Sequence, residues 1–117
     1  MFVKGKEIPR KIIEDLWRKH FSVKPLPKII ALNLEPEQFQ DAIRRILADD
    51  PSCDTRMQEY GELVEDLDGA SFKGRGTYFI LRCTTSNLTL EEILLHELQH
   101  IFRGDIDLKI HEGKSRS

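Results

Sequence analysis

Two histidines and a glutamate stand within five consecutive residues, His96-Glu97-Leu98-Gln99-His100. On a helix, side chains four residues apart lie on one face, one turn apart, so both histidine rings can bind the same metal ion. Neutral imidazole suits Zn²⁺, which needs no redox change. Glu97 follows the first histidine directly and is better placed to accept a proton from a metal-activated water than to bind the metal. These residues predict a zinc site that activates water, with Glu97 as general base.

The sequence around this pentapeptide predicts a helix over about residues 89–103. Thr89 and Glu92 have the spacing of a capping box, and Gly104 is placed to end the helix. Apolar residues surround most of the segment, which is typical of a helix buried in a core. Imidazoles and a carboxylate inside such a helix conflict with burial, and conflicts of this kind mark functional sites. The alternative is a pair of hydrogen-bonded core histidines with Glu97 as a surface acid.

Hydrophobic spacing and turn residues predict the remaining elements. These are helices over 8–20, from 35 or 36 to about 48, and over the acidic segment 57–67; strands over 28–33 and 77–83; and a hairpin turn at Gly74-Arg75-Gly76. The fold class expected is α+β, as a single domain over residues 1–117 with a frayed tail at 113–117. Its N-terminal helices pack on a small, mostly antiparallel sheet beside the central metal-binding helix.

A strand, a polar loop and then a helix with HExxH together resemble the active-site region of the zincin metallopeptidases, over roughly residues 77–107. The resemblance implies a zinc-dependent peptidase in which His96 and His100 bind the metal and Glu97 is the base. It also implies that a peptide or protein substrate lies extended along residues 77–83, as the edge strand of the sheet.

The third metal ligand is expected after the helix. Asp105 follows Gly104, where the chain can reverse, and its carboxylate would complete a three-ligand site with an open position for water. Asp107 and His111 are the alternatives, and Asp105 can equally be a surface acid at the helix end. The arrangement is similar to that of zincins that use an aspartate after a glycine turn.

Three further residues have a possible functional role beside a more common structural one. Tyr78 can hydrogen-bond to a substrate, although an aromatic residue on a strand is more often part of the core. Arg103 can bind a substrate carboxylate or, more commonly, the last helix carbonyls. Cys83 can reach the metal and block it, or is a buried apolar residue. His20 is expected to end the first helix.

Composition and charge narrow the class of protein. The chain has 117 residues, of which 39% are hydrophobic and 32% charged, as expected for one folded domain. No apolar run approaches the ~20 residues that a membrane span needs. Cys53 and Cys83 lie far apart without a disulfide pattern, which favours the reducing cytoplasm.

Charge is distributed unevenly along the chain, and this distribution is compatible with functions other than hydrolysis. Residues 1–30 contain eight Lys or Arg and three Asp or Glu, whereas residues 31–70 contain three and eleven. The basic residues within 4–19 are compatible with an adaptor for an acidic partner or nucleic acid, although such a run is more often a solvated helix face. A non-catalytic module, stabilised by metal and binding a partner along the edge strand, is the other alternative.

Overall fold

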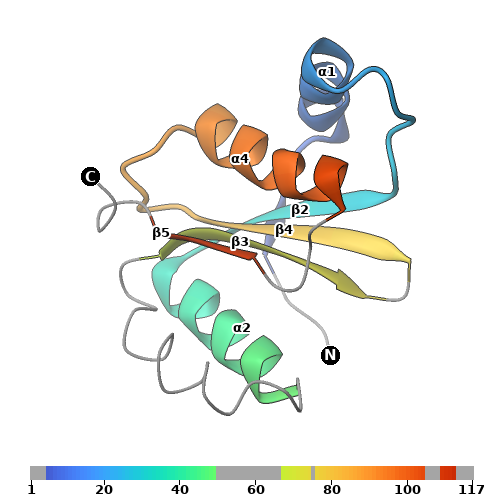
Figure 1. Ribbon diagram of the computed structural model, residues 1–117. Helices are drawn as coiled ribbons and strands as arrows, with labels where there is room; N and C mark the ends of the chain where they lie inside the picture. Colours follow the sequence, from blue (N-terminus) through green and yellow to red (C-terminus); the bar gives the residue numbers. More distant parts are fainter. Residues whose placement is uncertain (1–4, 50–66, 75, 105–108, 113–117) are drawn as a thin grey trace.

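The structure is a computed structural model that describes residues 5–49, 67–74, 76–104 and 109–112, with residues 46–49, 67 and 109–112 described by their backbone alone. In this part of the chain a five-stranded sheet separates two layers of helices (Figure 1). The elements are β1 (Lys6–Glu7), α1 (Arg10–His20), β2 (Ile29–Leu34), α2 (Pro36–Asp49), β3 (Leu67–Gly74), β4 (Thr77–Cys83), α4 (Leu90–Arg103) and β5 (Lys109–Glu112).

The strand order is β1-β2-β4-β3-β5, and among these described strands only the neighbours β2 and β4 run parallel. Helices α1 and α4 lie over one face of the sheet, and α2 covers the other (Figure 1). The α+β class and the mostly antiparallel sheet are therefore confirmed. The predicted elements of the described segments begin and end within two residues of their expected positions. The helix expected at 57–67 and the tail at 113–117 lie outside the described residues, except that Leu67 begins β3.

Helix α4 has the ends that its sequence predicts. The Thr89 side chain accepts a hydrogen bond from the Glu92 backbone N–H at 3.1 Å, which satisfies one of the free donors of the first turn. Gly104 has a φ of 73°, in the left-handed region that glycine adopts without strain, and its N–H donates to the carbonyls of His100 and Ile101. The two caps fix the register of the helix and hence the positions of the residues between them.

One expectation about the sheet is wrong: residues 77–83 form an interior strand, not an edge strand. Strand β4 lies between β2 and β3, where Ile80 pairs with Ala31 on one side and Ser71 on the other. Its backbone is therefore already paired along both sides and has no free edge for a peptide. Its nearly continuous apolar sequence is typical of a strand buried on both faces. The edge strands of the described sheet are β1 and β5.

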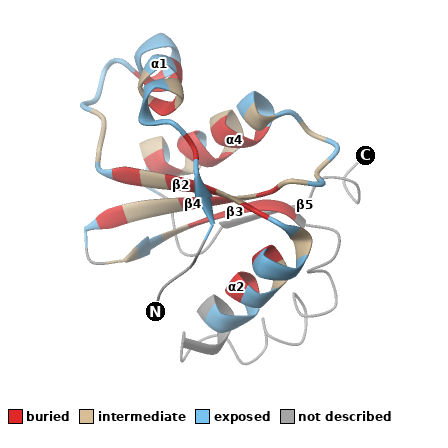
Figure 2. Cartoon of the chain, turned by 180° about the vertical axis from the view of Figure 1, so that it is seen from behind, coloured by how far each residue is buried: buried red, intermediate tan, exposed pale blue. Residues whose placement is uncertain are grey.

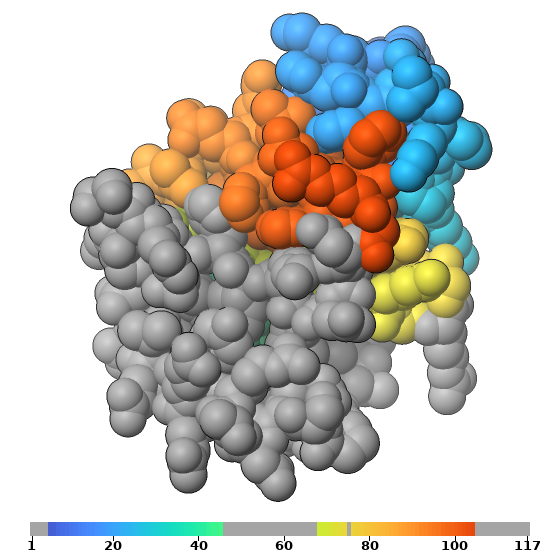
Figure 3. Space-filling view, in the orientation of Figure 1, coloured from blue at the N-terminus to red at the C-terminus, as the bar shows by residue number. Residues whose placement is uncertain are grey.

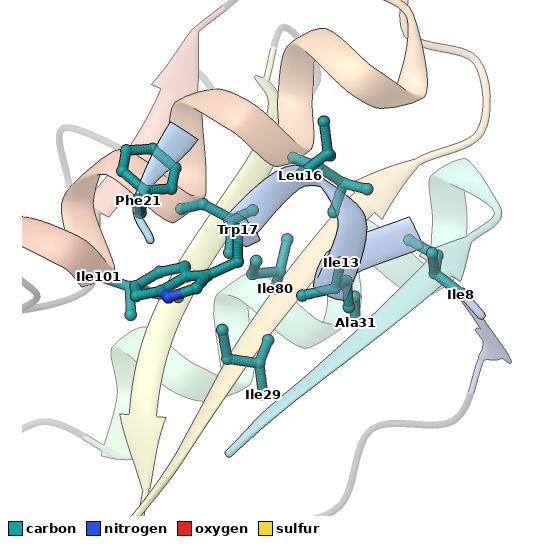
Figure 4. Close-up of a cluster of buried hydrophobic side chains, with 11 residues drawn as sticks. Ile8, Ile13, Leu16, Trp17, Phe21, Ile29, Ala31, Ile80 and Ile101 are labelled. Atoms are coloured by element: carbon teal, nitrogen blue, oxygen red, sulfur yellow. The ribbon is translucent and has the colours of Figure 1, made fainter. Parts of the chain in front are cut away.

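Two apolar clusters hold the layers together. Between the sheet and α1 and α4, Leu94 and Leu98 of α4 are fully buried with Ile80 of β4, and Trp17 of α1 packs in the same cluster (Figure 4). On the opposite face α2 contributes Phe39 and other residues to a second cluster. Buried residues accordingly follow the interior strands in Figure 2. None of the helices within the described ranges is long and apolar enough to cross a membrane.

Helix α4 packs closely against β3 at Gly69. A Cβ atom at this position would lie 2.8 Å from Ile93 Cγ2 and 3.1 Å from the carbonyl oxygen of Leu81. Such distances are too short for ordinary packing, so a larger residue would push α4 away from the sheet. The absence of a side chain at position 69 therefore sets the distance between the helix and the strand.

We expect Gly69→Ala to destabilise the fold by about 1–3 kcal/mol, because the added methyl group overpacks the contact between α4 and β3. Gly74→Ala is the matched control, since its Cβ would meet only Phe79 Cε2, at an ordinary 3.8 Å. Urea denaturation of both variants measures the difference. Equal stability of the two variants would contradict the close approach at Gly69.

Candidate functional site

His96 and His100 lie on one side of α4, where both are partly buried. Their ring centroids are 4.9 Å apart, and the ring planes meet at 83°. Two imidazoles that bind one tetrahedral ion through nitrogens at ~2.1 Å have centroids about 5 Å apart, so this separation suits a shared metal. The helix alone brings the two predicted ligands together, because it places residues four apart one turn from each other.

Glu97 is fully buried, with 0% of its surface exposed, which overturns the alternative that it is a surface acid. Its carboxyl group lies over β3, where Oε2 would be 3.7 Å from a Cβ on Gly69. Neither carboxyl oxygen has a hydrogen-bond partner among the described residues, and the same is true of the buried Ser71 hydroxyl. Ser71 is thus a neighbour of the carboxyl group without the geometry of a hydrogen bond.

Burial raises the pKa of Glu97 to about 8, and the adjacent Ser71 hydroxyl offsets part of this effect. The cause is desolvation, since removing a carboxylate from water disfavours its charged form. A cation beside Glu97 would favour the carboxylate again. The carboxyl group therefore suits a site next to a positive ion better than it suits an apolar core.

His96 and His100 suit two of the ligand positions of a zinc ion. Imidazole nitrogens are common zinc ligands, and the first histidine is directly followed by a buried carboxyl group that no described residue hydrogen-bonds. Across the described part of the chain, no group of three His, Cys, Asp or Glu side chains is assembled that could hold a metal. A zinc site with three protein ligands would require one beyond this described set.

The three residues considered as third ligand differ in what the structure says of them. Asp105 and Asp107 lie outside the described residues. His111 belongs to β5, whose backbone is described, and it pairs with Gly69, the strand position beneath Glu97. Strand β5 also contacts α4. The sheet register thus brings position 111 close to the strand that underlies the site.

The hypothesis that Cys83 reaches the metal and blocks it is wrong. Its side chain is buried in the cluster on the α2 face of the sheet, whereas α4 lies on the other face. Its Sγ atom contacts the Thr85 hydroxyl oxygen at 3.3 Å. Strand side chains alternate between faces, so the sheet itself separates Cys83 from the histidines.

The other residues singled out in the sequence lie in ordinary structural positions. Tyr78 is partly buried against the cluster below α4, and the Lys73 amine lies 5.2 Å from its ring centroid. His20 is the last residue of α1, as predicted. Gly76 has a φ of 80° in the turn between β3 and β4, which confirms the predicted hairpin.

Sequence reasoning missed the strand beneath the site. Gly69 and Ser71 are two residues apart on β3, so they share the face towards α4. Two small residues on one face of a strand are a signal of close approach by another element. Next to them, buried Asp68 accepts a hydrogen bond from Ser86 in the loop that leads to α4. That contact ties the start of β3 to the loop before the helix.

Searches of protein-family models, of curated proteins and of solved structures found no match to this chain.

We expect Glu97→Gln to make the metal-free protein more stable than the wild type, increasingly so as the pH rises. The native state keeps the Glu97 proton up to about pH 8, whereas the unfolded chain loses it near the ordinary value of 4.5. The stability of the wild type must therefore fall between these pH values, by on the order of a few kcal/mol, and glutamine removes this dependence.

Urea midpoints of both proteins at pH 5.5 and pH 8, with a chelator present, measure this effect. Glu92→Gln is the control, because Glu92 is exposed on the same helix. A wild-type protein whose stability relative to Glu97→Gln is the same at both pH values would contradict the burial of Glu97.

Proposed function

We propose that this chain is a zinc-dependent, metallopeptidase-like hydrolase in which His96 and His100 bind the metal and Glu97 is the general base. The observation that supports it most is the combination on α4 of two imidazoles at a metal-sharing distance with a buried carboxyl group that has no hydrogen-bond partner among the residues that the structure describes. A buried carboxyl group without a hydrogen bond is costly, and a catalytic role beside a cation gives a reason for it. Asp105 is the proposed third ligand.

In this proposal each residue of α4 has a separate task. When bound, zinc supplies a Lewis acid that polarises the substrate carbonyl and lowers the pKa of a water molecule to ~7. His96 and His100 orient the ion from the partly buried side of the helix. Glu97 accepts the proton of the attacking water at a carboxyl oxygen, and the neighbouring Ser71 hydroxyl of β3 favours the charged carboxylate. The substrate carbonyl would be that of a peptide or protein.

Cytoplasmic location is part of the same proposal. The support is the cysteine usage, since Cys83 is a free thiol buried in the core.

A non-catalytic, metal-stabilised module is the second candidate function, and one observation favours it. Glu97 has no exposed surface, whereas a general base must contact the water molecule that it deprotonates. An adaptor that binds an acidic partner through the basic residues 4–19 has weaker support. On α1, Arg10 pairs with Glu14, and Lys11 and Arg18 pair with Asp15, which neutralises part of that face.

We expect the purified chain to hold about one equivalent of zinc, and His96→Ala or His100→Ala to abolish this binding, since each removes one ligand. His20→Ala is the matched control, because His20 is exposed at the end of α1. Elemental analysis of untagged protein measures the metal. Zinc-free wild-type protein, even after zinc is added back, would contradict the proposal.

Glu97→Gln separates the two candidate functions. Under the hydrolase proposal, the variant keeps its zinc but loses hydrolysis by on the order of 10²–10⁴-fold, because the general base is gone. A screen with a degenerate peptide mixture, read by mass spectrometry, measures hydrolysis. Zinc-loaded wild-type protein that cleaves no peptide beyond the Glu97→Gln blank would favour the non-catalytic module.

The third ligand is tested by zinc affinity. We expect Asp105→Ala to weaken zinc binding by more than the 10–100-fold that is typical for losing an outer-sphere partner, and Asp107→Ala and His111→Ala to have smaller effects. Competition with a chromophoric chelator measures the affinities. If His111→Ala has the largest effect instead, the third ligand comes from β5.

A further inference from the structure

Arg103 lies on the same side of α4 as the two histidines, one turn beyond His100. A helix turns by about 100° per residue, so positions 96, 100 and 103 fall within about 60° of one another. Arg103 is exposed, whereas the histidines are partly buried. In the space-filling view α4 forms part of the surface next to α1 (Figure 3). The Arg103 side chain is therefore exposed to solvent on the side of α4 that carries the two histidines.

The structural role expected for Arg103 is filled by other residues. The Lys24 amine donates a hydrogen bond to the Phe102 carbonyl at 2.8 Å, and the Gly104 N–H donates to the carbonyls of His100 and Ile101. The last turn of α4 is thus capped without the guanidinium group. Capping of the helix end does not explain an arginine at position 103.

Arg103 also lacks an ion pair of the kind that Arg10 and Arg45 make within their helices. Arg10 pairs with Glu14 at 3.1 Å, and Arg45 pairs with Asp41 at 3.0 Å, each within one turn of its helix. On α4 the positions three and four residues before Arg103 are His100 and Gln99, neither of which is acidic. No hydrogen bond or ion pair of Arg103 occurs in the described part of the chain.

The charges on this side of α4 change sign along the helix. Exposed Glu92 stands one turn before His96, at the amino end, and Arg103 stands one turn after the histidine pair. The Lys24 amine, at the same helix end as Arg103, adds a second positive charge. A bound peptide is therefore favoured with its negative end towards the carboxyl end of α4.

We propose that Arg103 binds a substrate carboxylate next to the metal site, so that the hydrolase prefers peptides with a carboxylate close to the scissile bond. Residue 103 is about 4.5 Å beyond His100 along the helix axis, and an extended peptide advances ~3.3–3.6 Å per residue. The carboxylate thus belongs to the first or second residue after the scissile carbonyl. It is either the C-terminal carboxylate or an acidic side chain. This inference rests on the proposed function.

The test uses the full zinc-loaded chain and three non-hydrolysable dipeptide hydroxamates. One ends in a free alanine carboxylate, the second in alanine amide, and the third in aspartate amide. Calorimetry measures their dissociation constants. We expect at least one carboxylate probe to bind about tenfold or more tightly than the alanine amide, as is typical of a charge-assisted hydrogen bond. The probe that shows the preference identifies the source of the carboxylate.

Arg103→Gln should reduce this preference to about one, and Arg103→Lys should retain part of it. Arg44→Gln is the control, because Arg44 is an exposed arginine on α2, at the opposite face of the sheet, and its loss removes the same charge. The inference is overturned if Arg103→Gln keeps the preference, if Arg44→Gln abolishes it as well, or if the zinc-loaded chain binds all three probes equally or none. Protein that holds no zinc would instead overturn the proposed function, and the inference with it.

Discussion

The burial of the Glu97 carboxyl group between α4 and β3 is the constraint on which the site depends. A carboxyl group removed from water without a hydrogen bond costs on the order of several kcal/mol, so the surrounding core must offset it. Fully buried Leu94 and Leu98 of the same helix make that compensation, because they anchor α4 on β4. The apolar residues of α4 therefore hold the helix to the sheet, and they keep Glu97 buried although its burial is unfavourable.

This constraint explains why small residues line the strand below. Gly69 leaves room for Ile93 and for the Glu97 carboxyl group, and the Ser71 hydroxyl is a polar neighbour of that carboxyl. A bulky residue at either position would move α4 outwards and bring Glu97 towards water. The burial of the Glu97 carboxyl group thus depends on β3, which lies outside the His96–His100 segment itself.

Local features of the sequence predicted most of α4 but not its surroundings. The caps at Thr89 and Gly104 depend on neighbouring residues, and so does the placement of His96 and His100 on one helix side. The position of β4 inside the sheet depends on pairing with β2, more than forty residues earlier in the chain, which no local pattern encodes. The same non-local pairing decides that Cys83 faces α2. The burial of Glu97 follows from tertiary packing alone.

The exposure of polar groups around α4 changes in a fixed order, from buried Glu97 through the partly buried histidines to exposed Arg103. Each step matches the chemistry that the group is proposed to perform. A general base gains proton affinity from desolvation, metal ligands need one side open to solvent, and a guanidinium group that recognises substrate must be reachable before binding. A single helix that lies at the boundary between core and solvent therefore provides a buried, a partly buried and an exposed position. The rotation of about 100° per residue turns neighbouring side chains into these different environments without any change in the backbone.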